Sequence, residues 1–235
     1  MNRKSASARD EWAAQIAALD EQPAARKEPI TVGRIVDTAL RLVETDGYAS
    51  LTMRRVAAAL DTGPASLYAH VRNKAELDDL LIGALGKRVA LPAPDAERWR
   101  AQFADVCGQL RDEFLRYPGI AQAALSAAPK NLDTLRITEG MLGILLAGGV
   151  DPQAAAWTID AALLYVSAYT VEASLRRHPD GGRDTRVVDR AEALARLRML
   201  PMSRFPHTVE HADKIGAGEG HDRFDFALEL LLRGL

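Results

Sequence analysis

The stretch at positions 51–74, LTMRRVAAALDTGPASLYAHVRNK, limits the possible folds more than any other part of the chain. Its first half repeats apolar residues every three or four positions, which places them on one face of a helix. These residues are Met53, Val56, Ala57 and Leu60. After a break at 61–64, Leu67 and Val71 give a second short helix an inward stripe. Two short helices joined by a tight turn predict a helix-turn-helix, which presents the N-terminus of its second helix to the major groove of DNA.

The ends of the two helices carry local signals as well. Thr52 suits the N-cap of the first helix, because its hydroxyl can accept a hydrogen bond from an unpaired N–H of the first turn. In the turn, Gly63 tolerates backbone dihedrals that other residues avoid. Pro64 fits the first turn of the second helix, where its missing N–H is not needed. We therefore expect the second helix to begin at Pro64.

The runs T-M-R-R-V-A-x-x-L and S-L-Y-x-H-V-x-N-K, at 52–60 and 66–74, resemble the DNA-binding domain of the tetracycline-repressor (TetR) family of transcriptional regulators. The helices expected on either side fit the same resemblance, which covers residues 31–90 and weakens beyond them. Asp61 departs from the family pattern, which usually has glycine in the turn. Because aspartate tolerates left-handed conformations better than most residues, the turn remains compatible with the family.

The resemblance implies a set of DNA contacts at the matching positions. They are Thr52, Arg54, Pro64, Ala65, Ser66, Tyr68, His70 and Lys74. Arg54 would read a guanine, because its guanidinium fork can bond O6 and N7 together. Pro64 and Ala65 can offer only apolar contact, for example to a thymine methyl, while Ser66 can bond a base or a phosphate.

The remaining positions of this set would contact the DNA backbone. Tyr68, His70 and Lys74 would fix the register of the protein on the duplex and carry little sequence information. The alternatives are that Tyr68 and His70 pack between helices, and that Arg54 and Lys74 are solvated charges.

Net charge restricts how the chain could attract DNA. The formal charge of −2 excludes a generally basic nucleic-acid-binding protein, so any attraction has to be local. Positions 51–74 carry a local charge of +3, from four cations against the single anion Asp61. The cations are Arg54, Arg55, Arg72 and Lys74. This is the electrostatic footprint that phosphate contact requires.

Three further observations bear on the compartment. Cys107 is the single cysteine, which excludes an intrachain disulfide and suits a reducing cytosol. No apolar run approaches a membrane span, and the N-terminus MNRKSASARDEW lacks the apolar core of a signal peptide. We expect a cytoplasmic protein without membrane contact.

Residues 1–29 are expected to form an extension that is partly disordered, because positions 2–9 are small, polar and basic. Trp12, Ile16 and Leu19 fall at helical spacing and predict a short helix. The extension could be a flexible tail. It could also be an arm that inserts basic side chains into a minor groove, as the arms of other helix-turn-helix proteins do. The candidates for such an arm are Arg3, Lys4 and Arg9.

Helical patterns and prolines divide the rest of the chain. A helix capped by Thr31 is expected to run to Glu44 and to end at Gly47 in a left-handed C-cap. A further helix begins at Lys74 and ends before Pro92 and Pro94. We expect an all-α protein with an N-terminal three-helix helix-turn-helix domain at 30–91 and a C-terminal helical domain at 92–235, which binds a ligand and dimerises.

The C-terminal part shows helical periodicity and no strand alternation. Helices are expected at about 95–116, 119–127, 131–147, 152–177, 185–199 and 220–233. The last of them is apolar almost all round, so it needs cover on two sides, which a second subunit could provide. The resemblance points the same way, because TetR-like proteins dimerise through their last long helices. A homodimer through 152–177 and 220–233 is therefore expected.

A small-molecule effector implied by the resemblance would bind among the helices of this domain. Its candidate contacts are Phe103, Cys107, Met141, Trp157, Asp160, Tyr165 and Tyr169. The alternative is that the aromatic and sulfur-containing residues are ordinary core. Asp160 is the most informative candidate, because a carboxylate near an apolar helix face needs a partner if it is buried, and a polar group of a ligand could be that partner. The alternative is that Asp160 lies at the rim of the site. A redox role for Cys107 lacks support, since no basic neighbours in sequence favour a thiolate.

The run His207-Thr208-Val209-Glu210-His211 formally matches H-x-x-E-H, a zinc-peptidase pattern. On one helix the two histidines would share a face, and His221 or Asp213 could complete a metal site. The flanks are short and polar and begin with Pro206, so a solvated segment between the last helices is the plainer interpretation.

We expect no enzyme activity, no cofactor and no metal. The expected function is that of a homodimeric repressor that binds a double-stranded DNA operator and is released by a small molecule; an activator or a ligand-independent architectural protein are the alternatives.

Overall fold

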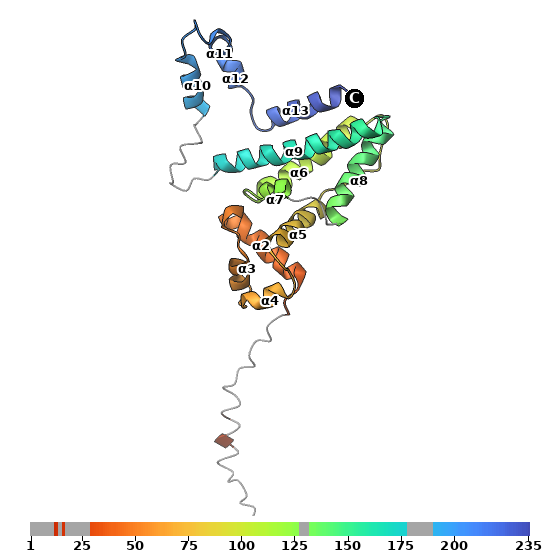
Figure 1. The fold of residues 1–235 in the computed structure, drawn as a ribbon, viewed down its shortest axis with the longest axis vertical. Coiled ribbons are helices and arrows are strands. Elements are labelled where there is room, and N and C mark those ends of the chain that lie inside the picture. Colours follow the sequence, from red (N-terminus) through yellow and green to blue (C-terminus); the bar gives the residue numbers. More distant parts are fainter. Residues whose placement is uncertain (1–11, 14–15, 17–28, 127–131, 178–189) are drawn as a thin grey trace, which may run out of the picture.

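The computed structural model describes residues 12, 13, 16, 29–126, 132–177 and 190–235, and all regular structure in these residues is helical (Figure 1). The predicted all-α fold is confirmed. Trp12, Ala13 and Ile16 are helical and exposed, in agreement with a short helix in the extension. Arg3, Lys4 and Arg9 lie outside the described residues.

The first group of helices builds the expected helix-turn-helix unit. Its elements are α2 (Val32–Asp46), η1 (Tyr48–Ser50), α3 (Met53–Ala59), α4 (Pro64–Tyr68) and α5 (Lys74–Lys87). Thr31 caps α2 as predicted, since its hydroxyl accepts the N–H of Arg34 at 3.2 Å. Gly47 ends α2 with φ 77° and ψ 157°. The positive φ was expected, but the ψ lies outside the left-handed helical region that the predicted C-cap requires.

The helices of this unit share one small core. Leu67 and Val71, the predicted inward pair, are fully buried, as are Ile35 and Val56. Leu77, four positions from Leu81 on α5, is buried beside them. The apolar spacing in the sequence therefore identified the inward faces correctly.

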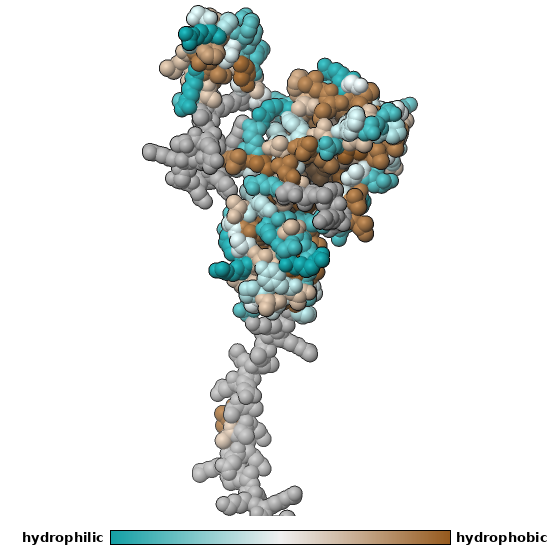
Figure 2. Space-filling view, in the orientation of Figure 1, coloured by the Kyte–Doolittle hydropathy of each residue, from teal (hydrophilic) through white to brown (hydrophobic). Residues whose placement is uncertain are grey.

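The second group forms a helical layer above the first in Figure 1. Its elements are α6 (Trp99–Arg116), α7 (Ala121–Ser126), α8 (Leu132–Ala147), α9 (Pro152–Arg177) and α13 (Asp222–Arg233). These bounds lie within four residues of the predicted ones. Hydrophobic side chains gather over this layer, whereas the end that carries α3 and α4 is more hydrophilic (Figure 2).

The structure places α10 (Arg190–Arg198), α11 (Pro206–Glu210) and α12 (Ala212–Ile215) away from that layer, where they pack on one another (Figure 1). The sequence predicted α10 and missed both short helices. Each of the two is a single turn or little more, which is too short for an apolar period to show.

Helix α9 differs from one expectation. Over Pro152–Leu175 it is long and apolar enough to cross a membrane by length and composition, although no run of the sequence was expected to approach such a span. The helix packs against α6, α7, α8 and α13, and Ala162 and Val166 are fully buried there. This is the environment of a helix in a protein core.

Helix α5 connects the two groups, because α6, α7 and α8 all pack on it. Arg136 of α8 donates hydrogen bonds to the carbonyl oxygens of Gly86 at 2.7 Å and Val89 at 2.9 Å, at the C-terminal end of α5. Lys87 pairs with Asp133 of α8 at 3.0 Å. The bonds from Arg136 add a side-chain donor to carbonyls near the C-terminal end of the helix, and together with the ion pair they fasten α5 to the second group.

Candidate DNA-binding surface and ligand cavity

The predicted DNA contacts lie at the start of α3, along and just after α4, and at the start of α5, and all but the half-buried Lys74 are exposed. Thr52 caps α3 through its hydroxyl, which accepts the N–H of Arg55 at 3.2 Å. Pro64 occupies the first position of α4, as predicted, and Ala65 and Ser66 follow it on the surface. All four residues are exposed, so a DNA groove could contact them without rearrangement of the core.

The phenol and imidazole of this surface point outward. Tyr68 is 49% exposed and His70 is exposed too, so neither is packed between helices, which was the alternative interpretation. The spacing of Leu67 and Val71 predicted a helix that reaches Val71, but α4 ends at Tyr68. The remaining turn is held by the N–H of Val71, which donates to the carbonyl of Leu67 at 3.0 Å.

The turn between the helices uses a residue other than the expected one. Asp61 has φ 50°, a left-handed conformation that aspartate adopts more readily than most residues. Gly63 has φ −79° and ψ 153°, which any residue can adopt. The turn therefore does not use the conformational freedom of Gly63. The left-handed residue of the turn is Asp61, at the position where the family usually has glycine.

In the folded chain, neighbouring carboxylates neutralise part of the +3 charge of positions 51–74. Arg55 pairs with Asp46 at 2.5 Å, and Arg72 pairs with Glu76 at 3.2 Å. Both carboxylates lie outside positions 51–74. Arg54 differs from them, because it is exposed and makes no hydrogen bond or ion pair with the described part of the chain. Arg54 is the cation of this surface that is available to a base edge.

Lys74 is held in a small network. Its ammonium pairs with the Asp78 carboxylate and lies 4.0 Å from the ring centre of Tyr48. The Tyr48 phenol donates to Oδ2 of Asp78 at 3.0 Å. Burial, and then the charge of Asp78, raise the pKa of Tyr48 above its ordinary value, so the phenol keeps the proton that it donates.

A cavity of about 450 Å³ lies between α5, α6, α7, α8 and α9. This size is typical of sites for small organic molecules. Its described walls include Asp79, Ile82, Gly86, Leu110, Phe114, Thr134, Ile137, Thr138, Ile159, Asp160, Leu163 and Ser167. Most of these side chains are apolar, and the polar ones come from α5, α8 and α9. Such a lining suits an apolar ligand with a few polar groups.

Two family models match the chain. The model of bacterial regulatory proteins of the tetR family matches residues 35–78, and that of the tetracyclin repressor-like C-terminal domain matches residues 91–235. The chain belongs to the TetR family. The family is one of transcriptional regulators, and the predicted ligand-responsive, DNA-binding repressor is confirmed at this level.

Individual relatives agree with the family. The HTH-type transcriptional repressor DrrR1 of Streptomyces coeruleorubidus is 27% identical over 217 residues, which cover 89% of this chain and 78% of the relative. ActR of Streptomyces coelicolor, solved in complex with actinorhodin, is 34% identical with a TM-score of 0.79, over 88% of this chain and 97% of ActR. BioQ, solved with its double-stranded DNA operator, is 29% identical with a TM-score of 0.56, over 63% of this chain and 90% of BioQ.

The structure brings only one of the seven predicted ligand contacts of this TetR-family chain to the cavity, namely Asp160. Phe103, Cys107 and Met141 are fully buried in the core and do not line it, so the core interpretation describes them. Burial raises the pKa of Cys107 to about 12, which keeps it a thiol and opposes a redox role.

The three aromatic candidates lie elsewhere as well. Trp157 is 69% exposed on α9. Tyr165 stacks on Phe224 of α13 with a ring distance of 5.5 Å, and Tyr169 bonds Nδ1 of His221 at 3.0 Å. These tyrosines therefore fasten α13 to α9. The cavity residues that sequence reasoning missed, such as Phe114 and Thr134, carry no signal that distinguishes a cavity wall from a core face.

The H-x-x-E-H run does not form a two-histidine helix face. Helix α11 ends at Glu210, and His211 lies between α11 and α12 with φ −107° and ψ 15°. The suggested third ligands are engaged elsewhere, since Asp213 pairs with Arg198 and His221 bonds Tyr169. Among the described residues, no three His, Cys, Asp or Glu side chains come together in a way that could hold a metal ion.

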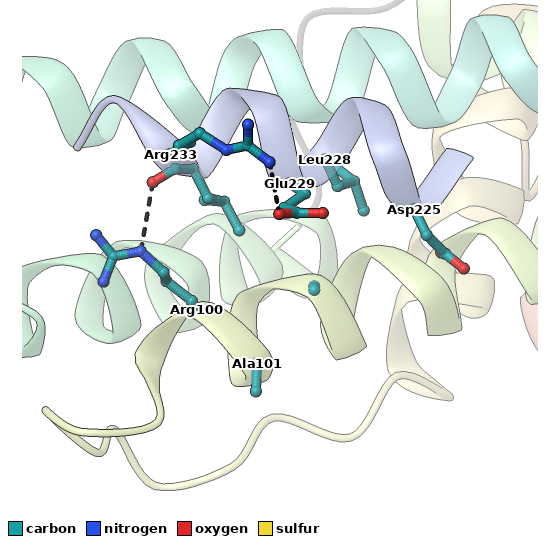
Figure 3. A pocket seen from close by; sticks show the side chains of 8 residues that line it. Arg100, Ala101, Asp225, Leu228, Glu229 and Arg233 are labelled. Atoms are coloured by element: carbon teal, nitrogen blue, oxygen red, sulfur yellow. Dashed lines mark hydrogen bonds and ion pairs between the residues drawn. The ribbon is translucent and has the colours of Figure 1, made fainter. Parts of the chain in front are cut away.

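A second cavity of about 490 Å³ is a groove between α6 and α13 (Figure 3). Its charged rim is satisfied within the chain. Arg100 donates to the carbonyl oxygens of Leu232 at 3.4 Å and Leu235 at 2.9 Å, and Arg233 pairs with Glu229 at 2.7 Å. The bonds from Arg100 of α6 hold the end of α13 against α6, which is a structural role.

Proposed function

We propose that the chain is a homodimeric repressor in which an effector bound in the cavity between α5 and α9 lowers the affinity for operator DNA. The observation that carries this proposal is the position of α5. Asp79, Ile82 and Gly86 of α5 line the cavity, while Lys74 begins the same helix beside the DNA-binding surface. A ligand that shifts α5 therefore acts on both places at once.

The contacts to DNA are proposed at exposed residues of and beside α3 and α4, and at Lys74, the first residue of α5. Arg54 and Ser66 would read bases, and Tyr68, His70 and Lys74 would hold the phosphate backbone. Thr52, Pro64 and Ala65 complete the surface. Because Lys74 is paired with Asp78, it has to exchange that carboxylate for a phosphate when DNA binds. An arm formed by Arg3, Lys4 and Arg9 would add minor-groove contacts to the same operator.

Dimerisation is proposed through α9 and α13. Large apolar side chains of these two neighbouring helices are exposed in the described part of the chain: Trp157, Leu175, Phe226 and Leu230 are 49–69% exposed. Exposed apolar surface of this extent on adjacent elements marks an interaction site. Members of the TetR family act as dimers, and a second copy of this chain is the natural cover.

Relatives support the repressor, operator-binding and ligand-binding parts of the proposal. DrrR1 is a repressor, BioQ has been solved with its operator, and ActR has been solved with actinorhodin. The family model of the DNA-binding region ends at residue 78 and that of the C-terminal domain begins at residue 91, which supports a division into a DNA-binding domain at 30–91 and a ligand-binding domain at 92–235. A regulator of this kind works in the cytoplasm, where the DNA is.

Operator selection from random double-stranded DNA tests the proposal. The full chain should enrich a nearly palindromic site whose half-sites lie about 34–36 Å apart, one turn of DNA. Retardation of DNA taken from the flank of the protein's own gene is a simpler first experiment. Effector binding and operator binding should weaken each other by the same factor, since coupling is reciprocal. Enrichment of no sequence, or a ligand that fills the cavity with unchanged operator affinity, would contradict the proposal.

A further inference from the structure

The helix-turn-helix unit meets the second group of helices at two separate places. The first is α5, the one helix of the unit that packs extensively on α6, α7 and α8 in the described chain. Helices α2, α3 and α4 pack mainly on one another and, through α2, on α5. A unit that is attached through one helix can still rotate about that helix. A second attachment point therefore decides whether its orientation is fixed.

The second place is η1, the short turn between α2 and α3. The backbone N–H of Tyr48 donates to the carbonyl of Pro118 at 2.8 Å, in the loop between α6 and α7. On the other side, the phenol of Tyr48 donates to Oδ2 of Asp78 on α5 at 3.0 Å. Tyr48 therefore bonds both the loop and α5, and it links the two attachment points.

Gly119 allows the loop to come close to η1. Its φ is 81°, a left-handed conformation that favours glycine. A β-carbon at this position would lie 3.4 Å from Cβ of Tyr48. The hydrogen bond between Tyr48 and Pro118 is thus accompanied by close packing of the loop on η1, and a larger residue at 119 would press on this contact.

Ser174 of α9 holds the loop from the other side. Its Oγ accepts the N–H of Gly119 at 3.1 Å and donates to the carbonyl of Thr170 at 2.8 Å. Because a hydroxyl has one proton, the bond to Thr170 orients it and leaves a lone pair for Gly119. Ser174 is only 6% exposed, and α9 packs on α6, α7, α8 and α13. The loop is therefore anchored to a helix of the core.

We propose that Ser174 is a positioning residue for operator recognition: through the loop it stops the helix-turn-helix unit from rotating about α5, and so it limits the half-site spacings that the protein accepts. The inference rests on the proposed function, because it assumes a dimer on a nearly palindromic operator. An orientation that is fixed before binding lowers the entropic cost of binding the matching operator, and it penalises operators whose half-sites are misplaced.

Half-site spacing provides the test. One inserted base pair moves a half-site by about 3.4 Å and turns it by about 34°. Fluorescence anisotropy compares the full chain on the palindrome selected from random DNA and on versions one base pair longer or shorter. The parent protein should prefer the selected spacing by at least about tenfold, because the altered sites require DNA or protein to deform. Ser174→Ala should reduce this preference to about threefold or less and weaken binding at the selected spacing by about two- to tenfold.

Two further variants separate positioning from general damage to α9. Thr170→Val is the matched control, a nearly isosteric change one turn earlier at a residue that is 1% exposed. The Thr170 hydroxyl donates to the carbonyls of Val166 and Ser167 within α9, so its loss should keep the parent's spacing preference. Gly119→Ala disturbs the contact from the loop and should relax the preference as Ser174→Ala does. Light scattering and melting temperature establish which variants are folded dimers.

The outcomes distinguish this inference from the proposed function. A parent protein that binds all three spacings equally would contradict the proposed palindromic operator. A parent preference that persists in folded Ser174→Ala, or in Gly119→Ala if only that variant folds, would overturn the role of Ser174 and leave the proposed function intact. An equal loss of preference in Thr170→Val would indicate general loosening of α9 and overturn it as well. Relaxed spacing in the loop variants alone would support it.

Discussion

The phenol of Tyr48 donates a hydrogen bond to Oδ2 of Asp78 over 3.0 Å, and the other carboxylate oxygen pairs with Lys74. Tyr48 comes from the short turn between α2 and α3, and its backbone N–H donates to the carbonyl of Pro118 at 2.8 Å. Next to it, the N–H of Gly119 donates to Oγ of Ser174 on α9 at 3.1 Å. The network joins the first residue of α5 to the helix that walls the cavity.

Tyr48→Phe should lower the free energy of unfolding by about 1.5–3 kcal/mol, because it removes a donor from a carboxylate that is only 7% exposed. Urea denaturation measures the change. Tyr68→Phe is the control, since its phenol is exposed on the DNA-binding surface, and its stability should equal that of the parent protein. If Tyr48→Phe and the parent protein have the same free energy of unfolding, the hydrogen bond of the Tyr48 phenol does not stabilise the fold.

Arg54→Ala and Arg55→Ala should separate recognition from stability. Arg54 has no partner in the described chain, so its loss should leave stability unchanged and reduce discrimination between operator and random DNA by about 1–3 kcal/mol. Arg55 pairs with Asp46 on the surface, so its loss should cost less than about 1 kcal/mol of stability. Fluorescence anisotropy on both DNAs measures discrimination. Intact discrimination in Arg54→Ala would rule out base reading by this residue.

Asp78→Asn should strengthen binding to all DNA sequences, because it keeps an acceptor for Tyr48 and removes the charge that holds Lys74. Lys74→Ala should do the opposite and reduce the slope of log affinity against log salt by about 0.9 for each lost phosphate contact. Binding measured from low to moderate salt gives both slopes. If the two variants show the same slope as the parent protein, Lys74 does not contact phosphate.

The sequence predicted what local chemistry determines. Thr31 and Thr52 cap their helices, Pro64 begins α4, and Leu67 and Val71 point inward, because each depends on its nearest neighbours in the chain. The charge of the surface was predicted less well. Asp46 and Glu76, which pair with Arg55 and Arg72, both lie outside positions 51–74. Glu76 is only four residues from Arg72, whereas Asp46 of α2 meets Arg55 of α3 through the folding of the two helices.

The cavity could not be predicted, for a related reason. Phe103 and Phe114 lie on the same face of α6, about three turns apart by helical geometry. Phe103 is fully buried in the core, and Phe114 lines the cavity. Both residues fit the same apolar periodicity, and this periodicity indicates only which side of a helix faces inward. Whether neighbouring helices leave a space there depends on packing across five helices. Asp160 was predicted because a carboxylate on a largely apolar helix is chemically exceptional.

Phe226→Glu should convert the dimer to a monomer. Phe226 is 58% exposed on α13, and a carboxylate in a self-complementary apolar interface would face its own copy across the symmetry axis or lie buried without a partner. Light scattering coupled to size exclusion measures the mass. Leu132→Glu is the control, because Leu132 is 81% exposed on α8, outside both proposed dimer helices. A dimer in both variants would place the interface elsewhere.

Cys107 should resist labelling by a disulfide reagent in the folded protein and react at once in urea, because it is fully buried. Burial raises its pKa from 9.0 to about 12, so this thiol favours folding in its protonated form. The contribution is complete below pH 9, and it is lost as the pH rises towards 12, where the unfolded chain has released a proton that the folded chain still holds. Stability should therefore fall by up to about 1.4 kcal/mol per pH unit across this window. In Cys107→Ala that part of the slope should disappear, although the variant is less stable at neutral pH because it leaves a small cavity.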